Sequence, residues 1–251
     1  MQLDGRIIDR AVKWDLGVNF SLNRSKVLVL SEDKDIFGGE LDNTILKDQL
    51  NLMRVGEPMY VFYGYVEDGY DENGHIVYKN MDDDPAITAA DKTIIGDPNP
   101  DFLVNLTTAV SYKGFTLSAF FQSSIGNDIY SLSMAAQAYD YGYNGNTLRE
   151  VYYNHWTPEN PTAKYPNLDQ TSYKMSDRFV YDGSFVRLKN LELAYDVPCA
   201  RSKFIKRARV YVSAQNLFTI TSYPFWDPDI NANGGGSSMI QGVDSYCYPS
   251  A

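Results

Sequence analysis

The segment from residue 80 to residue 91 has the spacing of a calcium-binding loop. Counted from Asn80, oxygen-bearing side chains occupy loop positions 1, 3, 5, 9 and 12, and the apolar Ile87 occupies position 8. This spacing approximates an EF-hand loop, in which oxygen ligands converge on a hard cation. Pro85, however, stands where the sharp turn of such a loop takes glycine. The pattern predicts either a calcium site or a solvated acidic loop, and the calcium ligands would be Asn80, Asp82, Asp84 and Asp91.

Aromatic residues are concentrated in a second polar segment, residues 138–156, beside asparagine, aspartate and glycine. Aromatic faces next to amide and carboxylate groups suit contact with a carbohydrate or a peptide. The alternative is that the rings pack the loops together, since large aromatic side chains are usually buried. The candidate ligand-binding residues are Tyr139, Tyr141, Tyr143, Trp156 and, in the last long polar segment, Trp226.

The sequence gives little support for catalysis. His155 has no nucleophile motif such as GxSxG beside it, and a hydrolase would require two carboxylates about 5 to 10 Å apart in one cleft, which nothing positions. The glycine run at 234–236 lacks the strand, helix and lysine of a phosphate-binding loop. The two cysteines and two histidines lie far apart in the sequence, which argues against a zinc site. We therefore expect a protein that is not an enzyme and requires no cofactor.

The composition, with 44% hydrophobic residues, indicates a folded chain rather than a disordered one. The 251 residues include 22 basic and 32 acidic side chains, a net charge of −10, so nucleic acid is not an expected partner. Tyrosine, with 20 residues, outnumbers phenylalanine, with 12. Rings with a polar tip suit membrane interfaces and sugar sites. No segment approaches the roughly 20 apolar residues of a transmembrane helix, but a membrane-spanning strand would not show that signal.

Alternation of apolar and polar residues predicts several β-strands. The even positions from Val12 to Leu22 are all apolar, whereas the positions between them are polar or glycine. The segments 102–112 and 115–125 alternate in the same way, apart from Thr108 and Phe120. Weaker alternation predicts strands at 190–197 and 209–220, and a less certain strand covers 51–66.

The segments 102–112 and 115–125 are expected to pair as a hairpin. If Lys113 and Gly114 form a two-residue turn, Tyr112 lies opposite Phe115, and the apolar residues of both strands share one face. Lysine is not the preferred first residue of such a turn, so a slightly longer turn with a bulge is the alternative.

Strand and loop lengths favour a membrane β-barrel. Strands of globular proteins usually have about 5 to 6 residues, whereas a tilted membrane strand needs about 9 to 11. The three clearest segments each have eleven. Short connections at 113–114 and 198–207 alternate with long polar ones at 67–100, 126–182 and 222–248, as in barrels with brief turns on one side and large loops on the other. The alternative is a secreted β-sandwich that binds glycans.

Eight segments in the same order resemble the C-terminal part of SusC/RagA-type TonB-dependent outer-membrane receptors. Among them are DGSFVRLKN at 182–190, RVYVSAQNLF at 209–218 and DPD at 227–229. The others are 56–65, 94–100, 112–115, 126–130 and 156–161. Any one segment is weak support, but eight in order make the resemblance specific.

The resemblance implies an all-β fold: an antiparallel transmembrane β-barrel segment, part of a 22-stranded barrel, with long extracellular loops. Such receptors lie in the cell outer membrane and import oligosaccharides or peptides together with a SusD-like surface lipoprotein, and the TonB complex supplies the energy. Residues 1–251 would be the C-terminal part of the barrel, with about six strands and without the plug domain, the TonB-contacting segment and the final strand. The apolar strand faces would contact outer-membrane lipid. The aromatic residues of the loops could also contact the SusD-like lipoprotein instead of a ligand. A segment with two open sheet edges is not expected to form a sealed pore alone.

Overall fold

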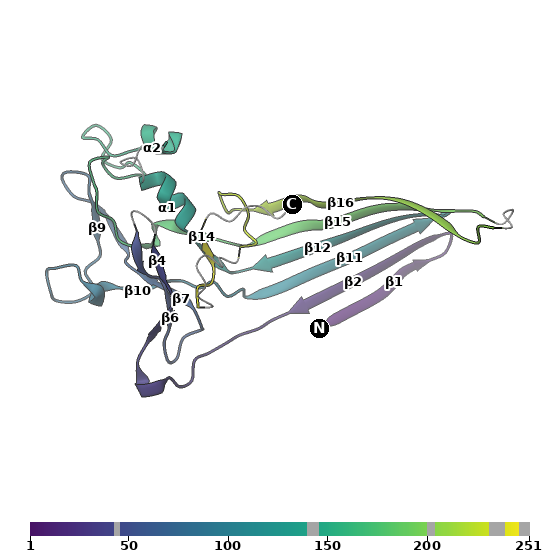
Figure 1. Cartoon of the computed structure of the whole chain (residues 1–251), viewed down its shortest axis with the longest axis horizontal. Coiled ribbons are helices and arrows are strands. Elements are labelled where there is room, and N and C mark those ends of the chain that lie inside the picture. Colours follow the sequence, from purple (N-terminus) through teal and green to yellow (C-terminus); the bar gives the residue numbers. More distant parts are fainter. Residues whose placement is uncertain (43–45, 140–145, 200–203, 231–238, 246–251) are drawn as a thin grey trace.

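A six-stranded antiparallel sheet of long strands dominates the fold (Figure 1). The computed structural model describes residues 1–42, 46–139, 146–199, 204–230 and 239–245. The strands follow the order β1-β2-β11-β12-β15-β16, so that β1 and β16 are the two edges. Their bounds are β1 (Gln2–Asp9), β2 (Val12–Ser21), β11 (Phe102–Tyr112), β12 (Phe115–Ile125), β15 (Phe185–Val197) and β16 (Ala208–Thr221).

The hairpin of β11 and β12 has the predicted register. Tyr112 pairs with Phe115, and Leu106 pairs with Phe121. The turn residues Lys113 and Gly114 have φ angles of 48° and 86°. Two positive φ angles are typical of the type I′ turn, whose twist matches that of the flanking strands. The prediction of a two-residue turn is therefore confirmed.

Three details of the strand prediction are wrong. The segment 51–66 is not one strand, because a turn with positive φ at Gly56 and Tyr60 reverses the chain between β6 (Asn51–Met53) and β7 (Val61–Gly64). The sixth strand of the large sheet is instead β1, whose alternation is interrupted by a register shift between Arg6 and Ile8. β15 also begins at Phe185, earlier than predicted, and carries a register shift between Leu188 and Asn190.

Residues paired across the six strands give the sheet one apolar face and one polar face. Side chains directly opposite each other in neighbouring strands lie on the same face. One row that crosses all six strands is wholly apolar: Leu3, Val18, Leu106, Phe121, Leu188 and Phe218. A second apolar row lies nearer the hairpin turns: Ile8, Trp14, Val110, Leu117, Leu193 and Val212.

The long connections form a second region at one end of the sheet, opposite the hairpin turns (Figure 1). We call this region the loop layer; it comprises the described residues of 22–101, 126–184 and 222–245. Its strands are β3 (Ile36–Phe37), β4 (Glu40–Asp42), β5 (Lys47–Gln49), β6, β7, β8 (Glu67–Tyr70), β9 (Ile76–Tyr78), β10 (Thr93–Gly96), β13 (Asp128–Ser131), β14 (Val180–Asp182) and β17 (Val243–Asp244). Its helices are α1 (Leu132–Tyr139) and α2 (Arg149–Tyr153), with 3-10 turns η1 (Ser31–Asp33), η2 (Ala89–Asp91) and η4 (Asp177–Phe179).

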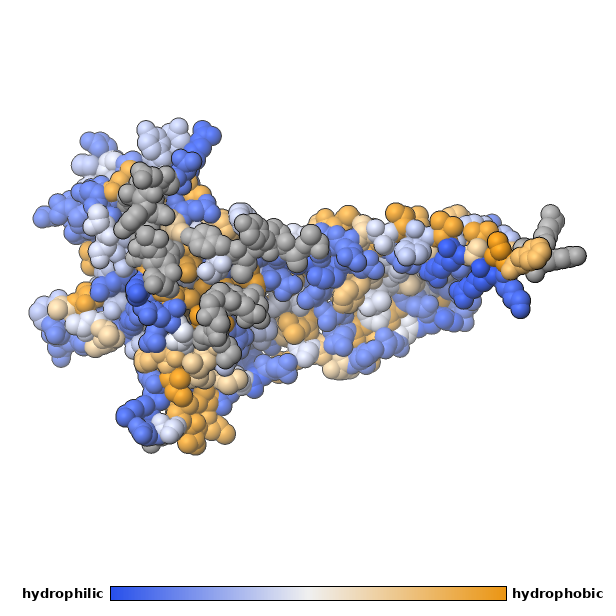
Figure 2. Space-filling model, in the orientation of Figure 1, coloured by the Kyte–Doolittle hydropathy of each residue, from blue (hydrophilic) through white to orange (hydrophobic). Residues whose placement is uncertain are grey.

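The main hydrophobic core lies in the loop layer and not against the large sheet. Its residues, among them Leu50, Phe62 and Tyr130 with no exposed surface, all come from the loop layer. The apolar face of the sheet is uncovered by contrast: Leu117 is 47% exposed and Val212 is 66% exposed. Hydrophobic residues accordingly reach the surface along the sheet (Figure 2).

Within the described part of the chain, none of the helices has the length and apolar character needed to cross a membrane.

Candidate functional site

The polar face of the large sheet carries paired charges. Arg6 contacts Asp15 with an Nε to Oδ1 distance of 2.8 Å, and Arg209 contacts Glu192 with an Nη2 to Oε1 distance of 3.2 Å. Each pair joins neighbouring strands of the sheet. This face is therefore chemically suited to water, whereas the opposite face is suited to an apolar surrounding.

Four carboxamide side chains lie in one row across the polar face. The row continues into a buried arginine and a threonine, and its members are Gln2, Asn19, Asn105, Gln122, Arg187 and Thr219. Asn105 borders two hollows, one of about 300 Å³ on the side of the loop layer and one of about 270 Å³ on the side of the turns. The row thus lies a short distance inside the end of the sheet that the loop layer covers.

Arg187 holds the last long loop against this face. Its side chain is 2% exposed, and its Nε donates a hydrogen bond of 2.9 Å to Oγ1 of Thr219. The guanidinium contacts the carboxylate of Asp227 directly and lies 3.5 Å from Oδ2 of Asp229. Burial of a charge is costly unless it is paired and hydrogen-bonded, and here both conditions are met. The segment 227–229 is thereby fixed beside the loop-side hollow, which Asp229 lines.

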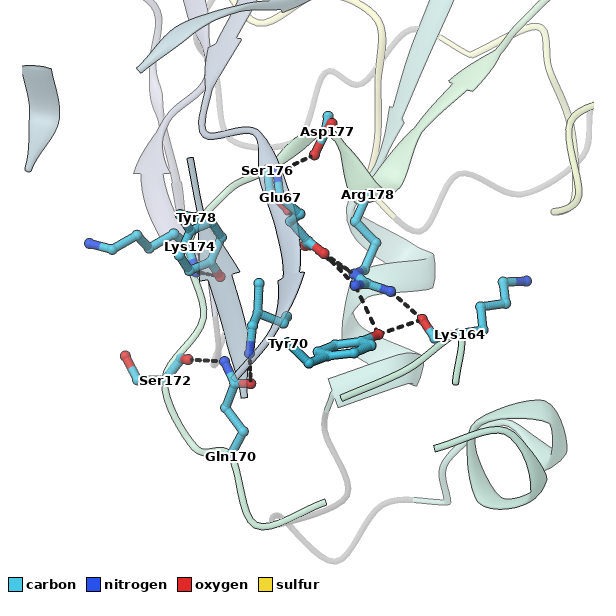
Figure 3. A network of polar contacts seen from close by, with 11 residues as sticks. Glu67, Tyr70, Tyr78, Lys164, Gln170, Ser172, Lys174, Ser176, Asp177 and Arg178 are labelled. Carbon is cyan, nitrogen blue, oxygen red and sulfur yellow. Dashed lines mark hydrogen bonds and ion pairs between the residues drawn. The ribbon is translucent and has the colours of Figure 1, made fainter. Parts of the chain in front are cut away.

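A second buried ion pair organises the loop layer (Figure 3). Glu67 of β8 and Arg178 of η4 form a bidentate contact, with side chains only 10% and 17% exposed. The same guanidinium donates to the hydroxyl of Tyr70 at 3.1 Å and to the backbone oxygen of Lys164. Burial by itself lowers the pKa of Arg178, but the hydrogen bonds to Glu67 and the electrostatic interactions with Tyr139, Glu67 and Tyr70 together outweigh burial and raise the pKa. Segments far apart in the sequence are joined by this arginine.

A third polar cluster connects the last loop to α1. Asp244 accepts hydrogen bonds from the hydroxyls of Ser133 at 2.9 Å and Tyr223 at 2.5 Å. Burial and the contact with Asp244 both raise the pKa of Tyr223, so its hydroxyl stays protonated at neutral pH. The three clusters give the loop layer a defined structure.

The candidate aromatic residues do not come together at one site. Tyr139 is 4% exposed and stacks on Tyr173, with ring centres 3.8 Å apart, a position that fits the packing interpretation. The indole of Trp156 is half-buried and lies against Gly74. Trp226 is 50% exposed and stacks on Phe225, with ring centres 5.0 Å apart. Tyr141 and Tyr143 lie outside the described residues, so ligand contact by the five aromatics stays a prediction.

The sequence did not single out two exposed rings of the same segment. Tyr152 and Tyr153 of α2 are 62% and 64% exposed, and their rings meet edge to face with centres 5.2 Å apart. The carboxamide row was also missed. The predicted hairpin register does place Asn105 opposite Gln122, and this register was the signal that could have found it.

The acidic loop forms a series of tight turns. Side-chain oxygens of Asn80, Asp82 and Asp84 each accept a backbone N–H two residues further along, at 2.8 to 3.1 Å. Asp91 is buried and accepts from the backbone of Met81 and Thr88, which lowers its pKa. Among the described residues, no group of three or more His, Cys, Asp or Glu side chains has metal-binding geometry. Calcium binding stays a prediction, which calcium titration calorimetry of the full-length protein tests.

His155 is engaged with the backbone. Its Nδ1 lies 2.8 Å from the carbonyl oxygen of Tyr152, and this contact places the ring beside the Tyr152 side chain, with ring centres 6.5 Å apart.

Known proteins with a similar sequence are bacterial receptors. TonB-dependent receptor P3 of Formosa agariphila is 31% identical over 97% of this chain, and TonB-dependent receptor SusC of Bacteroides thetaiotaomicron is 27% identical over 98%. The chain spans about a quarter of the length of these curated relatives, 26% and 24% respectively. No family model matches the chain.

Solved structures with a similar fold are those of the RagAB transporter. The structure of the RagAB peptide transporter matches 99% of this chain with a TM-score of 0.78 and 25% identity, over 27% of its own length. The RagAB peptide importer in its closed-closed state gives a TM-score of 0.79 at 24% identity, over 99% of this chain and 27% of its own. The relatives named here are receptors or transporters and not enzymes. The chain belongs to the SusC/RagA-type TonB-dependent receptors, and its six-stranded sheet with the loop layer is a segment of their β-barrel.

Proposed function

We propose that this chain is part of an outer-membrane receptor that imports a solute by TonB-dependent transport. The observation that carries the proposal is the uncovered apolar face of the large sheet. Two rows of six apolar side chains cross all strands in register, and Val212 in one of them is 66% exposed. Such a face lowers its free energy when it contacts hydrocarbon, and the polar face behind it then lines an aqueous lumen.

The partners of the receptor are a SusD-like surface lipoprotein and the TonB complex. The lipoprotein would contact the loop layer, whose buried ion pairs give it a fixed shape. Similarity to structures named RagAB supports an assembly of this kind. The TonB complex would act through a part of the receptor that precedes the barrel segment.

The substrate class is an oligosaccharide or a peptide. The name of the solved RagAB relatives specifies peptides, whereas the receptor names of the curated relatives specify no substrate. The polar face suits either class because its exposed groups include both hydrogen-bond donors and acceptors.

Cell fractionation and uptake measurements on the full-length receptor test the proposal. We expect it in the outer-membrane fraction, with heat-modifiable migration in detergent, and we expect solute uptake to cease when TonB is deleted. A strain that lacks the receptor gene controls for uptake by other routes. Soluble recovery of the full-length product would instead support the alternative, a secreted β-sandwich module.

A further inference from the structure

The hairpin turns of the large sheet, at the end away from the loop layer, are basic. The described residues that connect the long strands there are 10–11, 113–114, 198–199 and 204–207. They include four basic side chains and no acidic one: Arg10, Lys113, Lys206 and Arg207. The chain as a whole has a net charge of −10. Positive charge is therefore concentrated at the turn end, and the acidic excess lies elsewhere in the chain.

Three of these four cations have no carboxylate partner. Arg207 lies 3.9 Å from Asp196, measured from Nη2 to Oδ1. Among the residues that the structure describes, Arg10, Lys113 and Lys206 form no ion pair, and all three are exposed. Their charges are therefore available to an anionic partner.

A row of aromatic rings lies beside these turns on the apolar face of the sheet. Tyr112, Phe115 and Tyr195 pair in register across β11, β12 and β15. The rings of Phe115 and Tyr195 have centres 4.4 Å apart. The Nζ of Lys113 lies 5.1 Å from the centre of the Tyr112 ring. This contact holds the ammonium group at the edge of the apolar face and not over the polar face.

The aromatic row lies at the level where a membrane has its headgroups. β11 has 11 residues and begins and ends on the apolar face, with Phe102 and Tyr112. It rises about 34 Å along the strand, or about 26 Å along the membrane normal at a tilt of about 40°. The apolar band of a membrane barrel is about 25 Å tall and is flanked by aromatic residues. In the turn after β15, Phe204 is 96% exposed and adjoins Lys206 in the sequence, and an apolar ring next to a cation suits the boundary of acyl chains and headgroups.

We propose that the turn end of the sheet binds the phosphate groups of anionic phospholipids in the adjoining leaflet of the membrane. Arg10, Lys113 and Lys206 contact the phosphates, and the aromatic row packs against the first carbons of the acyl chains. A lipid with net negative charge is favoured over a zwitterionic one, because the choline or ethanolamine group of the latter brings its own cation next to the basic side chains. The inference goes beyond transport and rests on the proposed membrane location of the sheet.

Lipid association at the turn end of the full-length receptor tests the inference. A bimane fluorophore is attached to a cysteine placed at Leu117, on the apolar face two residues from Phe115, with the native cysteines replaced by serine. The receptor is reconstituted in phosphatidylcholine bilayers, and either brominated phosphatidylglycerol or brominated phosphatidylcholine is added as the quencher. We expect phosphatidylglycerol to associate about fivefold more strongly than phosphatidylcholine at low salt. This ratio should fall as salt screens the charges.

Three sets of variants identify the side chains responsible. The triple variant Arg10→Gln, Lys113→Gln and Lys206→Gln should lower the ratio to about one. The charge-conserving variant Arg10→Lys, Lys113→Arg and Lys206→Arg should keep it. The matched control, which should also keep it, removes three exposed lysines of the loop layer: Lys34→Gln, Lys47→Gln and Lys164→Gln.

A wild-type ratio of about one would overturn the inference, and so would an unchanged ratio in the glutamine variant or an equal loss in the loop-layer control. Each of these results leaves TonB-dependent import intact. Absence of quenching by both lipids would instead contradict the membrane location of the apolar face, on which this inference and the proposed function both rest.

Discussion

Trp14 Nε1 donates a hydrogen bond of 2.9 Å to Oγ1 of Thr108 on the apolar face of the sheet. Thr108 is the residue that interrupts the apolar alternation of β11. In hydrocarbon there is no water to satisfy an indole N–H, so a polar partner on the same face is needed. The exception in the sequence pattern is therefore explained by its neighbour on β2.

Replacing Thr108, the hydrogen-bond partner of Trp14, should measurably lower the stability of the sheet. Thr108→Val keeps the side-chain shape and leaves the Trp14 N–H unpaired, so we expect a loss of about 1 kcal/mol in the free energy of unfolding. The measurement is reversible urea unfolding of the receptor in lipid bilayers. Thr107→Val is the matched control, because Thr107 lies on the polar face beside water. Equal losses in both variants would contradict this role of Thr108.

Breaking the buried ion pair of Glu67 and Arg178 should lower the local stability of the loop layer much more. Glu67→Ala leaves the Arg178 charge buried without its carboxylate, so we expect the loop layer to lose about 3 to 5 kcal/mol of local stability. Hydrogen exchange of the amides in residues 164–178 measures this loss. Glu150→Ala is the control, because the pair of Glu150 and Lys164 is 47% and 60% exposed and should contribute less than about 1 kcal/mol. Similar exchange in the two variants would refute the assignment of Arg178 as the central contact.

The strands were predictable where alternation was unbroken. The register of β11 and β12 follows from one turn, since Lys113 and Gly114 fix every pair up to Phe102 opposite Ile125. β1 was missed because the register shift between Arg6 and Ile8 leaves two apolar residues in succession. The first part of β15 was also missed at a register shift, where the polar residues Lys189 and Asn190 follow each other and break the alternation.

The organisation of the loop layer could not be predicted from local patterns. Glu67 and Arg178 are 111 positions apart, and neither lies in a periodic segment. Tyr139 was proposed as a ligand contact because it stands in a polar, glycine-rich segment. It is buried because α1 turns it toward Tyr173 and Phe179, contacts that depend on tertiary packing.

Asp128 of β13 and Asp182 of β14 lie opposite each other in the strand register. We expect pH to change their contributions to stability in opposite directions. Burial and the nearby charges of Asp97 and Asp182 raise the pKa of Asp128 above its model-compound value of 3.8. Its contribution to stability is fully present below the unfolded-state pKa and is lost as pH rises through the folded-state pKa. Asp128→Asn should therefore be more stable than the wild type at pH 7, with the difference vanishing near pH 3.

Asp182 is the matched control for that experiment. Hydrogen bonds from Ser184 and Ser222 lower the pKa of Asp182, so its contribution is present above the unfolded-state pKa and is lost as pH falls through the folded-state pKa. Asp182→Asn should be less stable than the wild type at pH 7 and equal to it at low pH. Hydrogen exchange of residues 128–131 and 180–182 gives the readout, and a shared sign for both variants would disprove the account.

Two of the candidate aromatics should respond differently to truncation. Tyr139→Ala removes a ring stacked in the loop core, and we expect a loss of about 3 to 5 kcal/mol in local stability. Trp226→Ala should change stability by less than about 1 kcal/mol, because half of its surface is exposed. If Trp226 contacts the solute, uptake falls in this variant while the loop layer remains protected from protease. Normal uptake would assign Trp226 to packing.

The environment of the strand faces is the most direct test of the central claim, that one face of the sheet meets lipid and the other meets water. Spin labels are attached to cysteines placed at Leu117, Ser118, Val212 and Ser213 of the full-length receptor in bilayers, with the native cysteines replaced by serine. The account predicts that labels at Leu117 and Val212 collide with lipid-dissolved oxygen, and that labels at Ser118 and Ser213 collide with a water-soluble nickel complex. Labels at Leu117 and Val212 that are shielded from both reagents would contradict it, because a second layer of protein would then cover the apolar face.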